Sequence, residues 1–205
     1  MLSLVATPIG NLADITYRAV DVLKKADVIV CEDTREVIKI LRKYQIPAKK
    51  LISFYEEVEA NKQEEILKLC TDNNVALVSD SGTPLISDPG YKLIRDAIAR
   101  NIPVETLPGP CAAITALVAS GLPPDKFTFW GFPKKNKATS AEGTNIYFVS
   151  PHKLVKFLQN LDSNQQIVIC RELTKIYEEV WQGTVADAIV KFAKPKGEFV
   201  VLWHI

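Results

Sequence analysis

Short apolar runs alternate with amphipathic stretches along the first half of the chain. After the first run, apolar side chains recur at helical spacing from Ile15 to Ala26, and Asp14 or Thr16 can cap that helix. The same alternation predicts strands at residues 2–6, 28–31, 51–54, 75–79 and 104–107, and further helices at 35–44, 61–70 and 91–100. Because a helix lies between successive strands, we expect an α/β domain with a parallel sheet.

The second half has a different pattern. Residues 108–110, Pro-Gly-Pro, interrupt regular structure, so we expect one domain at 1–109 and another at 110–205. The pattern beyond them predicts a helix at 111–119 and strands at 127–130, 146–149, 167–170 and 199–203. Residues 177–182 and 184–193 are both ambiguous, although the spacing of apolar residues favours a helix in the second segment. The polar connection between Phe132 and Ile146 is expected to be a mobile surface loop.

The composition is that of an ordinary folded protein. The chain has 205 residues, of which 47% are hydrophobic and 24% charged, enough for one large core or two small ones. Its apolar runs are much shorter than the roughly 20 residues that a membrane helix needs, so we expect a cytoplasmic protein. The net charge is only +1, so contact with nucleic acid would have to come from local patches.

Several chemistries are disfavoured by what the sequence lacks. The cysteines Cys31, Cys70, Cys111 and Cys170 form no C-x-x-C pair, and we expect them to be reduced, with most of them buried. With two histidines in the chain, no metal site is expected. The absence of a G-x-G-x-x-G after the first strand, and of a P-loop, counts against dinucleotide and nucleoside-triphosphate folds.

The most informative stretch is V-S-D-S-G-T-P-L-I-S-D-P-G at residues 78–90. It follows a buried strand, and open α/β sheets bind ligands at that edge. Gly82 allows a ligand to approach the backbone, and Asp80 and Asp88 can accept hydrogen bonds from it. A plain surface turn has the same composition, so both interpretations stay open. Residues 7–11 and 108–110 also follow strands, and three such loops can frame one pocket.

Charged residues follow three other strands. Asp33, in Glu-Asp-Thr-Arg at residues 32–35, can deprotonate a substrate or merely cap the next helix. His152 can transfer a proton, although a surface position beside a helix cap is favoured. The charges at residues 171–175, Arg-Glu-Leu-Thr-Lys, can hold a phosphate or pair with each other.

Six short motifs occur in order along nearly the whole chain. They are VATPIGNLADIT at 5–16, CEDTR at 31–35, SDSGTPLISDPG at 79–90, LPGP at 107–110, SGLP at 120–123 and RELTK at 171–175. Together they resemble the ribosomal RNA small subunit methyltransferase I family, within the tetrapyrrole methylase superfamily. The resemblance implies a homodimer of chains with two α/β domains and a cofactor cleft between them. It also implies methyl transfer from S-adenosylmethionine to a cytidine ribose 2'-hydroxyl in small-subunit rRNA.

The resemblance also implies which residues form the site. Cofactor contacts carried over by motif are Pro8, Ser81, Gly82, Thr83, Ile86, Pro110, Cys111, Ala112, Phe148, Val149, Glu172 and Leu173. Methyl transfer from a sulfonium requires oriented reactants and removal of the hydroxyl proton. Asp33 is the leading candidate for the base, with Arg35 and Lys175 as phosphate contacts.

The sequence departs from the family pattern on the expected substrate side. The family usually has a longer segment between Pro133 and Phe148, and a glutamate at the position of Val149. The sequence also ends at Ile205, without a helical module that many relatives carry. We therefore expect RNA to be held through the lysines of the polar connection and a second subunit. These lysines are Lys134, Lys135 and Lys137.

Two other functions stay open. A methylase of the same superfamily with a different acceptor would bind S-adenosylmethionine and ignore ribosomal subunits. A non-catalytic scaffold with this fold would not bind the cofactor.

Overall fold

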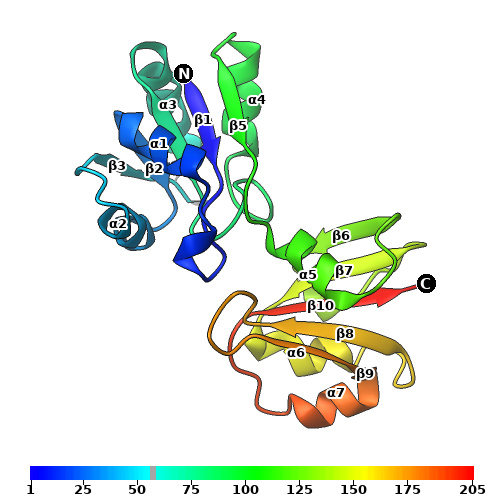
Figure 1. Cartoon of the computed structure of the whole chain (residues 1–205). Coiled ribbons are helices and arrows are strands. Elements are labelled where there is room, and N and C mark those ends of the chain that lie inside the picture. Colours follow the sequence, from blue (N-terminus) through cyan, green and yellow to red (C-terminus); the bar gives the residue numbers. More distant parts are fainter. Residues whose placement is uncertain (56–58) are drawn as a thin grey trace. The chain divides into compact units, whose positions relative to one another are not determined.

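The computed structural model describes residues 1–55 and 59–205, without the side chains of 59–61. The chain forms two compact units, Met1–Cys111 and Ala112–Ile205 (Figure 1). Each unit contains one five-stranded sheet with helices packed on it, which confirms the predicted class of two α/β units. No helix within the described ranges is long and apolar enough to cross a membrane.

The sheet of the first unit is entirely parallel, as predicted. Its strands lie in the order β3-β2-β4-β1-β5. They are β1 (Leu2–Val5), β2 (Val28–Cys31), β3 (Lys50–Ser53), β4 (Val75–Val78) and β5 (Val104–Leu107). The helices are η1 (Leu12–Asp14), α1 (Tyr17–Lys25), α2 (Thr34–Lys43), α3 (Glu59–Asp72) and α4 (Tyr91–Ala99).

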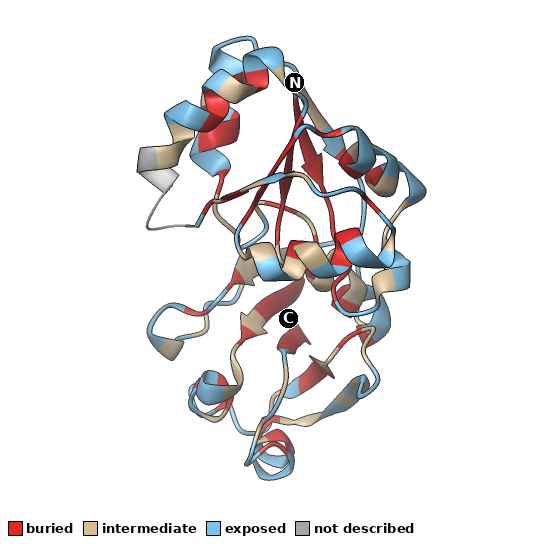
Figure 2. Cartoon of the chain, turned by 90° about the vertical axis from the view of Figure 1, so that its left-hand side faces the viewer, coloured by how far each residue is buried: buried red, intermediate tan, exposed pale blue. Residues whose placement is uncertain are grey.

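Helices cover both faces of this sheet, which explains why its central strands are apolar at almost every position. Leu4 and Leu77 face one core with residues of α3 and α4, whereas Val5 and Val78 face a second core with α1 and α2. Alternate strand residues therefore pack on opposite sides, and strands of this sheet are coloured as buried in Figure 2. The carboxyl edge of the sheet is left for loops. Of the two possible caps for α1, Thr16 is used, since its hydroxyl accepts from the Ala19 amide at 3.0 Å.

The second unit has a mixed sheet in the order β6-β7-β10-β8-β9, in which only β6 and β7 are parallel. Its strands are β6 (Phe127–Gly131), β7 (Thr144–Val149), β8 (Gln166–Arg171), β9 (Glu179–Thr184) and β10 (Phe199–His204). Its helices are α5 (Ala112–Ser120), η2 (Lys134–Asn136), α6 (Pro151–Leu158) and α7 (Val185–Lys191). The main core includes Tyr147, Phe157 and Trp203, with apolar residues of α6 and α7.

The structure resolves or corrects several predictions in this unit. Of the ambiguous residues 177–182, the last four belong to strand β9, and the favoured helix is α7. Helix α6 was not predicted. The connection between Phe132 and Ile146 contains the short helix η2 and is hydrogen-bonded to the sheet, and its expected mobility stays a prediction. The Thr139 amide donates to Tyr147 Oη at 2.7 Å, and that hydroxyl donates back to the Thr139 carbonyl.

Candidate functional site

Two loops at the carboxyl edge of the first sheet are joined by their backbones. The Thr7 amide donates to the Gly82 carbonyl at 2.9 Å, and the Gly82 amide donates to the Thr7 carbonyl at 3.1 Å. The buried Thr7 hydroxyl also donates to the Ser79 carbonyl at 3.1 Å. The loop after β1 is thereby fixed against the loop after β4.

A third loop joins them through Thr83, whose hydroxyl donates to the Pro110 carbonyl at 2.9 Å. Gly82 has a φ of +86°, and a Cβ there would lie 3.2 Å from Ile9 Cγ2. A Cβ at Gly109 would lie only 2.6 Å from Ala6 Cβ. Glycine is therefore required at both positions for the three loops to approach one another this closely.

These contacts bring together the predicted cofactor residues of the first unit. They are Pro8, Ser81, Gly82, Thr83, Ile86, Pro110 and Cys111. Ser81 and Ile86 are exposed, whereas Pro8 and Gly82 are buried, so a ligand at this edge would meet side chains and backbone of the loop after β4. The arrangement of three loops after β1, β4 and β5 agrees with the geometry expected from the sequence.

The remaining predicted cofactor residues belong to the second unit. Ala112 begins α5. Phe148 and Val149 end β7, and Glu172 and Leu173 follow β8. Val149 and Arg171 both pair with Phe199 of β10, so these two strand ends lie at one edge of the sheet. The structure thus places the predicted cofactor residues in two groups, one in each unit.

Val149, the position where the family usually has glutamate, is a core residue in this chain. Its side chain is 1% exposed and belongs to the apolar cluster that contains Leu154 and Phe157. A carboxylate in that environment would lose its hydration without gaining a charged partner. Any contact of Val149 with a cofactor therefore falls to its backbone atoms.

Asp33 has the capping role that the sequence left open. Its carboxylate accepts from the Arg35 amide at 2.8 Å and from Arg35 Nε at 3.0 Å. The hydrogen bonds from the Arg35 side chain, followed by the one from its amide, lower the pKa of Asp33 to about 2. Its own amide donates to Asp80 Oδ1 at 2.8 Å, which links this motif to the loop after β4. Capping and a role in proton transfer are compatible, and the latter stays a prediction.

Arg35 and Lys175, the predicted phosphate contacts, differ in how far their charges are already engaged. The Arg35 side chain is 83% exposed although it pairs with Asp33. Lys175 is less exposed, and its ammonium lies 3.0 Å from carboxylate oxygens of both Glu172 and Glu198. Arg35 can therefore turn to an incoming phosphate more readily than Lys175 can.

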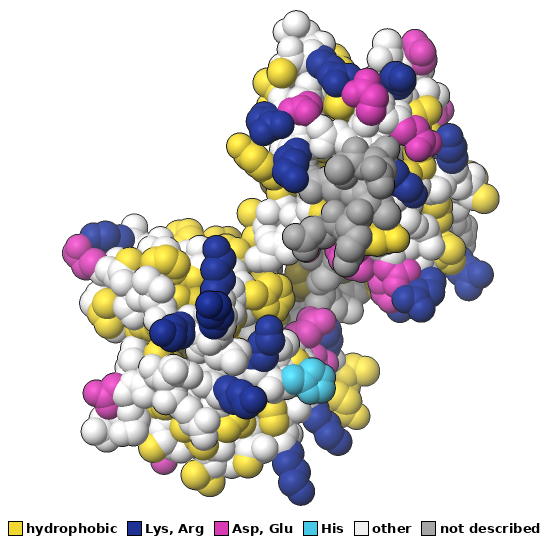
Figure 3. Space-filling view, turned by 180° about the vertical axis from the view of Figure 1, so that it is seen from behind, with side chains coloured by type: hydrophobic (Ala, Val, Ile, Leu, Met, Phe, Trp, Pro, Cys, Tyr) yellow, Lys and Arg dark blue, Asp and Glu magenta, His cyan; other side chains and the backbone are white. Residues whose placement is uncertain are grey.

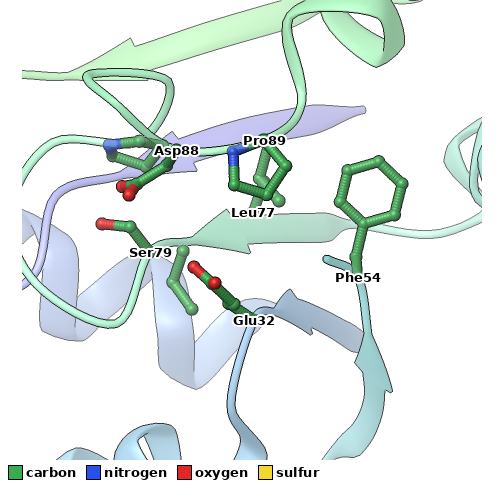
Figure 4. Close-up of a pocket in the computed structure, with 8 residues that line it drawn as sticks. Glu32, Phe54, Leu77, Ser79, Asp88 and Pro89 are labelled. Atoms are coloured by element: carbon green, nitrogen blue, oxygen red, sulfur yellow. The ribbon is translucent and has the colours of Figure 1, made fainter. Parts of the chain in front are cut away.

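A small pocket beneath the loop after β4 contains acidic residues that the sequence did not indicate as a pair (Figure 4). Its lining residues are Glu32, Phe54, Leu77, Val78, Ser79, Pro84, Asp88 and Pro89. The Asp88 Oδ2 atom is buried and accepts no hydrogen bond from the described part of the chain. Burial, followed by the nearby Glu32 carboxylate, raises the pKa of Asp88 to about 6. Only the fold brings these two acids together.

Replacing Asp88 with asparagine is expected to stabilise the protein at pH 8 by about 1 kcal/mol, after allowance for partial exposure. The folded state raises the pKa of this acid to about 6, so the carboxylate destabilises the fold fully above pH 6 and progressively less below it. Urea denaturation of both proteins at pH 8 and pH 4 measures the difference. The gain should disappear at pH 4, and an equal gain at both values would contradict the assignment.

Three of the four cysteines are buried and the fourth, Cys111, is half-buried. Burial is the main cause that raises the pKa of both Cys31 and Cys170 to about 12, so these thiols stay neutral. His152 is exposed on α6. Among the described residues, no group of three or more His, Cys, Asp or Glu side chains is placed to hold a metal ion.

Comparison with known proteins agrees with this geometry. Residues 1–189 match the family described as Tetrapyrrole (Corrin/Porphyrin) Methylases. A ribosomal RNA small subunit methyltransferase I from Hydrogenobaculum sp. (strain Y04AAS1) is 46% identical over 98% of this chain and 94% of its own length. Its counterpart from Halalkalibacterium halodurans is 44% identical over 98% of this chain and 74% of its own length.

A solved structure supports the fold. The crystal structure of uroporphyrin-III-C-methyltransferase from Thermus thermophilus has a TM-score of 0.72 at 20% identity and covers 98% of this chain and 93% of its own. The six sequence motifs, the joined loops at the carboxyl edge of the first sheet and the similarity over nearly the full length lead to one conclusion. The chain belongs to the ribosomal RNA small subunit methyltransferase I family of the tetrapyrrole methylases.

Proposed function

We propose that this protein is an S-adenosylmethionine-dependent methyltransferase that modifies a cytidine ribose 2'-hydroxyl in small-subunit (16S) rRNA. The observation that carries the proposal is the loop cluster of the first unit, by which we mean the three joined loops after β1, β4 and β5. Hydrogen bonds from Gly82 and Thr83 join three family motifs at the edge where open α/β sheets bind ligands. The names of the two relatives, which match 98% of this chain, support the rRNA substrate.

The loop cluster suits a cofactor because its three loops lie close together and have glycine where they meet. Glycines at positions 82 and 109 remove side chains where a Cβ would crowd Ile9 or Ala6. In the proposed site, this group would hold S-adenosylmethionine, which would supply an electrophilic methyl on a sulfonium. The contacts of Phe148 and Glu172 with the cofactor stay a prediction. The protein contributes mainly the orientation of the methyl toward the ribose oxygen.

Proton removal and substrate charge are assigned to three residues. Asp33 accepts the proton of the 2'-hydroxyl. Its pKa of about 2 keeps the carboxylate ionised, although it is a weaker base than a carboxylate with a pKa near 7 would be. Arg35 contacts a neighbouring phosphate through its exposed guanidinium. Lys175 does the same after exchanging one of its two carboxylate partners. The proposed enzyme is a cytoplasmic homodimer, as the family resemblance implies.

Isothermal titration with S-adenosylhomocysteine tests the cofactor site. We expect saturable binding, because the reaction product occupies the same loops as the cofactor. An absence of binding by folded protein would favour the non-catalytic scaffold. Binding without methyl transfer to small ribosomal subunits would favour a methylase with a different acceptor.

A further inference from the structure

Five lysines of the second unit lie on two adjoining segments. Lys134 and Lys135 belong to η2 and Lys137 follows it, while Lys153 and Lys156 belong to α6. All five are exposed, and η2 packs against α6. We call these residues the lysine surface. Seen from behind, Lys and Arg side chains gather on one side of the second unit (Figure 3).

The positive charge of this surface is not balanced locally. Residues 131–161 contain one acidic residue, Glu142, which pairs with Lys126 at 2.5 Å. None of the five ammonium groups forms an ion pair within the described part of the chain. In a chain with a net charge of only +1, such a concentration of unpaired lysines favours a polyanionic partner.

The backbone presents these lysines from a fixed base. Lys135 and Asn136 have left-handed φ values of 52° and 59°, and the turn is closed by a hydrogen bond from the Lys137 amide to the Lys134 carbonyl at 3.1 Å. Beyond the turn, Thr139 is fixed to Tyr147. The three lysines of the turn are therefore spread around a tight bend that is closed by a hydrogen bond.

Helix α6 carries a positive charge near its N-terminus, where the helix dipole disfavours positive charge. Leu154, Phe157 and Leu158 are fully buried, which directs Lys153 and Lys156 outward, one helical turn apart. Lys153 lies in the first turn, close to the positive end of the helix dipole, and no acidic residue stands there to compensate. An anion bound at this end of the helix would relieve the repulsion.

An exposed aromatic ring connects the lysine surface with the proposed cofactor group. Phe132, which is 56% exposed, precedes Pro133 and η2. Its ring packs edge-on against Phe148 with centroids 5.8 Å apart. An exposed ring beside unpaired lysines is the combination that binds a nucleic acid strand, because the ring stacks on a base and the lysines contact phosphates.

We propose that the lysine surface, together with Phe132, holds the sugar-phosphate backbone of the RNA on which this enzyme acts. The inference rests on the proposed function and names the part of the second unit that binds the substrate. Lys153 and Lys156 extend the contact beyond the three lysines of the polar connection. Because Phe132 packs on Phe148, a strand bound at the lysine surface would lie next to a predicted cofactor residue of the same unit.

The test compares Lys153→Gln/Lys156→Gln with wild type in binding to isolated small ribosomal subunits over a range of KCl concentrations. We expect affinity to fall roughly tenfold at low salt, and the log-log salt slope to become shallower by about 0.7 for each phosphate that the variant no longer neutralises. The matched control is Lys24→Gln/Lys25→Gln, which removes two exposed lysines from α1 and should leave both quantities unchanged. Affinity for S-adenosylhomocysteine should be the same in all three proteins.

Unchanged affinity and salt slope in Lys153→Gln/Lys156→Gln would overturn the assignment of the lysine surface. Binding of wild type to vesicles containing anionic phospholipid, abolished in this variant while its affinity for subunits persists, would reassign the surface to a membrane. Failure of the wild type to methylate subunits would instead count against the proposed function. The methylation assay uses the wild type alone, whereas the lysine surface is tested by comparing the variant with the wild type. The two negative results can therefore be told apart.

Discussion

Gly82→Ala is expected to weaken S-adenosylhomocysteine binding at least roughly tenfold, equivalent to about 1.4 kcal/mol. Two effects combine. The backbone at Gly82 has a φ of +86°, which costs a residue with a Cβ about 1 kcal/mol. The new methyl would also lie 3.2 Å from Ile9 Cγ2 and 3.5 Å from the Pro110 carbonyl, so it would push apart the loops that the Thr7 and Thr83 hydrogen bonds hold together. Isothermal titration measures the loss.

Gly121→Ala is the matched control for this substitution. Gly121 also has a positive φ, +69°, but nothing lies within 4 Å of the position that a Cβ would take. In urea denaturation Gly121→Ala should therefore show only the cost of the positive φ, and Gly82→Ala that cost together with the crowding. Only Gly82→Ala should lose affinity. Equal affinities in the two variants would show that the loop cluster does not hold the cofactor.

Asp33→Asn is expected to slow methyl transfer roughly 100-fold or more in single turnovers, because it removes the proposed proton acceptor. Asparagine caps a helix about as well as aspartate, so α2 should remain folded. The control is Glu36→Gln, which removes a charge from the same helix at a residue that pairs with Lys39. It should transfer the methyl at the wild-type rate, and a wild-type rate in Asp33→Asn would remove Asp33 from the mechanism.

The pH dependence of the single-turnover rate separates Asp33 from the other acids of this region. Since the pKa of Asp33 is about 2, its carboxylate stays ionised and the wild-type rate should not fall between pH 8 and pH 5. A decrease centred near pH 6, absent in Asp88→Asn, would transfer the role of base to Asp88, whose pKa is about 6.

The first unit was predictable because its strands and helices are regular and local. Its central strands β1, β2 and β4 are apolar at almost every position, and Thr16 and Asp33 mark helix starts with their own side chains. The convergence of three loops followed from the same regularity, since parallel strands separated by helices place their following loops at one edge.

The second unit was less predictable because its signals are short or depend on distant partners. Helix α6 has only 8 residues and begins at Pro151, almost directly after β7, so no distinct turn separates its pattern from that of the strand. Strand β9 is an edge strand without buried residues, and its pairing with β8 is visible only in the fold. The anchoring of the connection after Phe132 depends on Tyr147 and Asn145, whose hydrogen-bond partners no local pattern specifies.

The environment of the acidic residues was also beyond the sequence. Glu32 and Asp88 follow different strands, and their charges interact only because β2 and β4 are neighbours in the sheet. The partners of Lys175 have the same origin, since Glu198 stands just before β10 and reaches the end of β8 through the pairing of these strands. Motif positions indicate which residues gather at the site, and the fold determines which of their charges are already engaged.

Transfer of tritium from S-adenosyl-[methyl-³H]methionine to small ribosomal subunits lacking the modification tests the central claim most directly. The account predicts label in the rRNA, in one cytidine whose 3' phosphodiester bond resists alkali because its 2' oxygen is methylated. Rapid binding of S-adenosylhomocysteine with no label in the rRNA would contradict it.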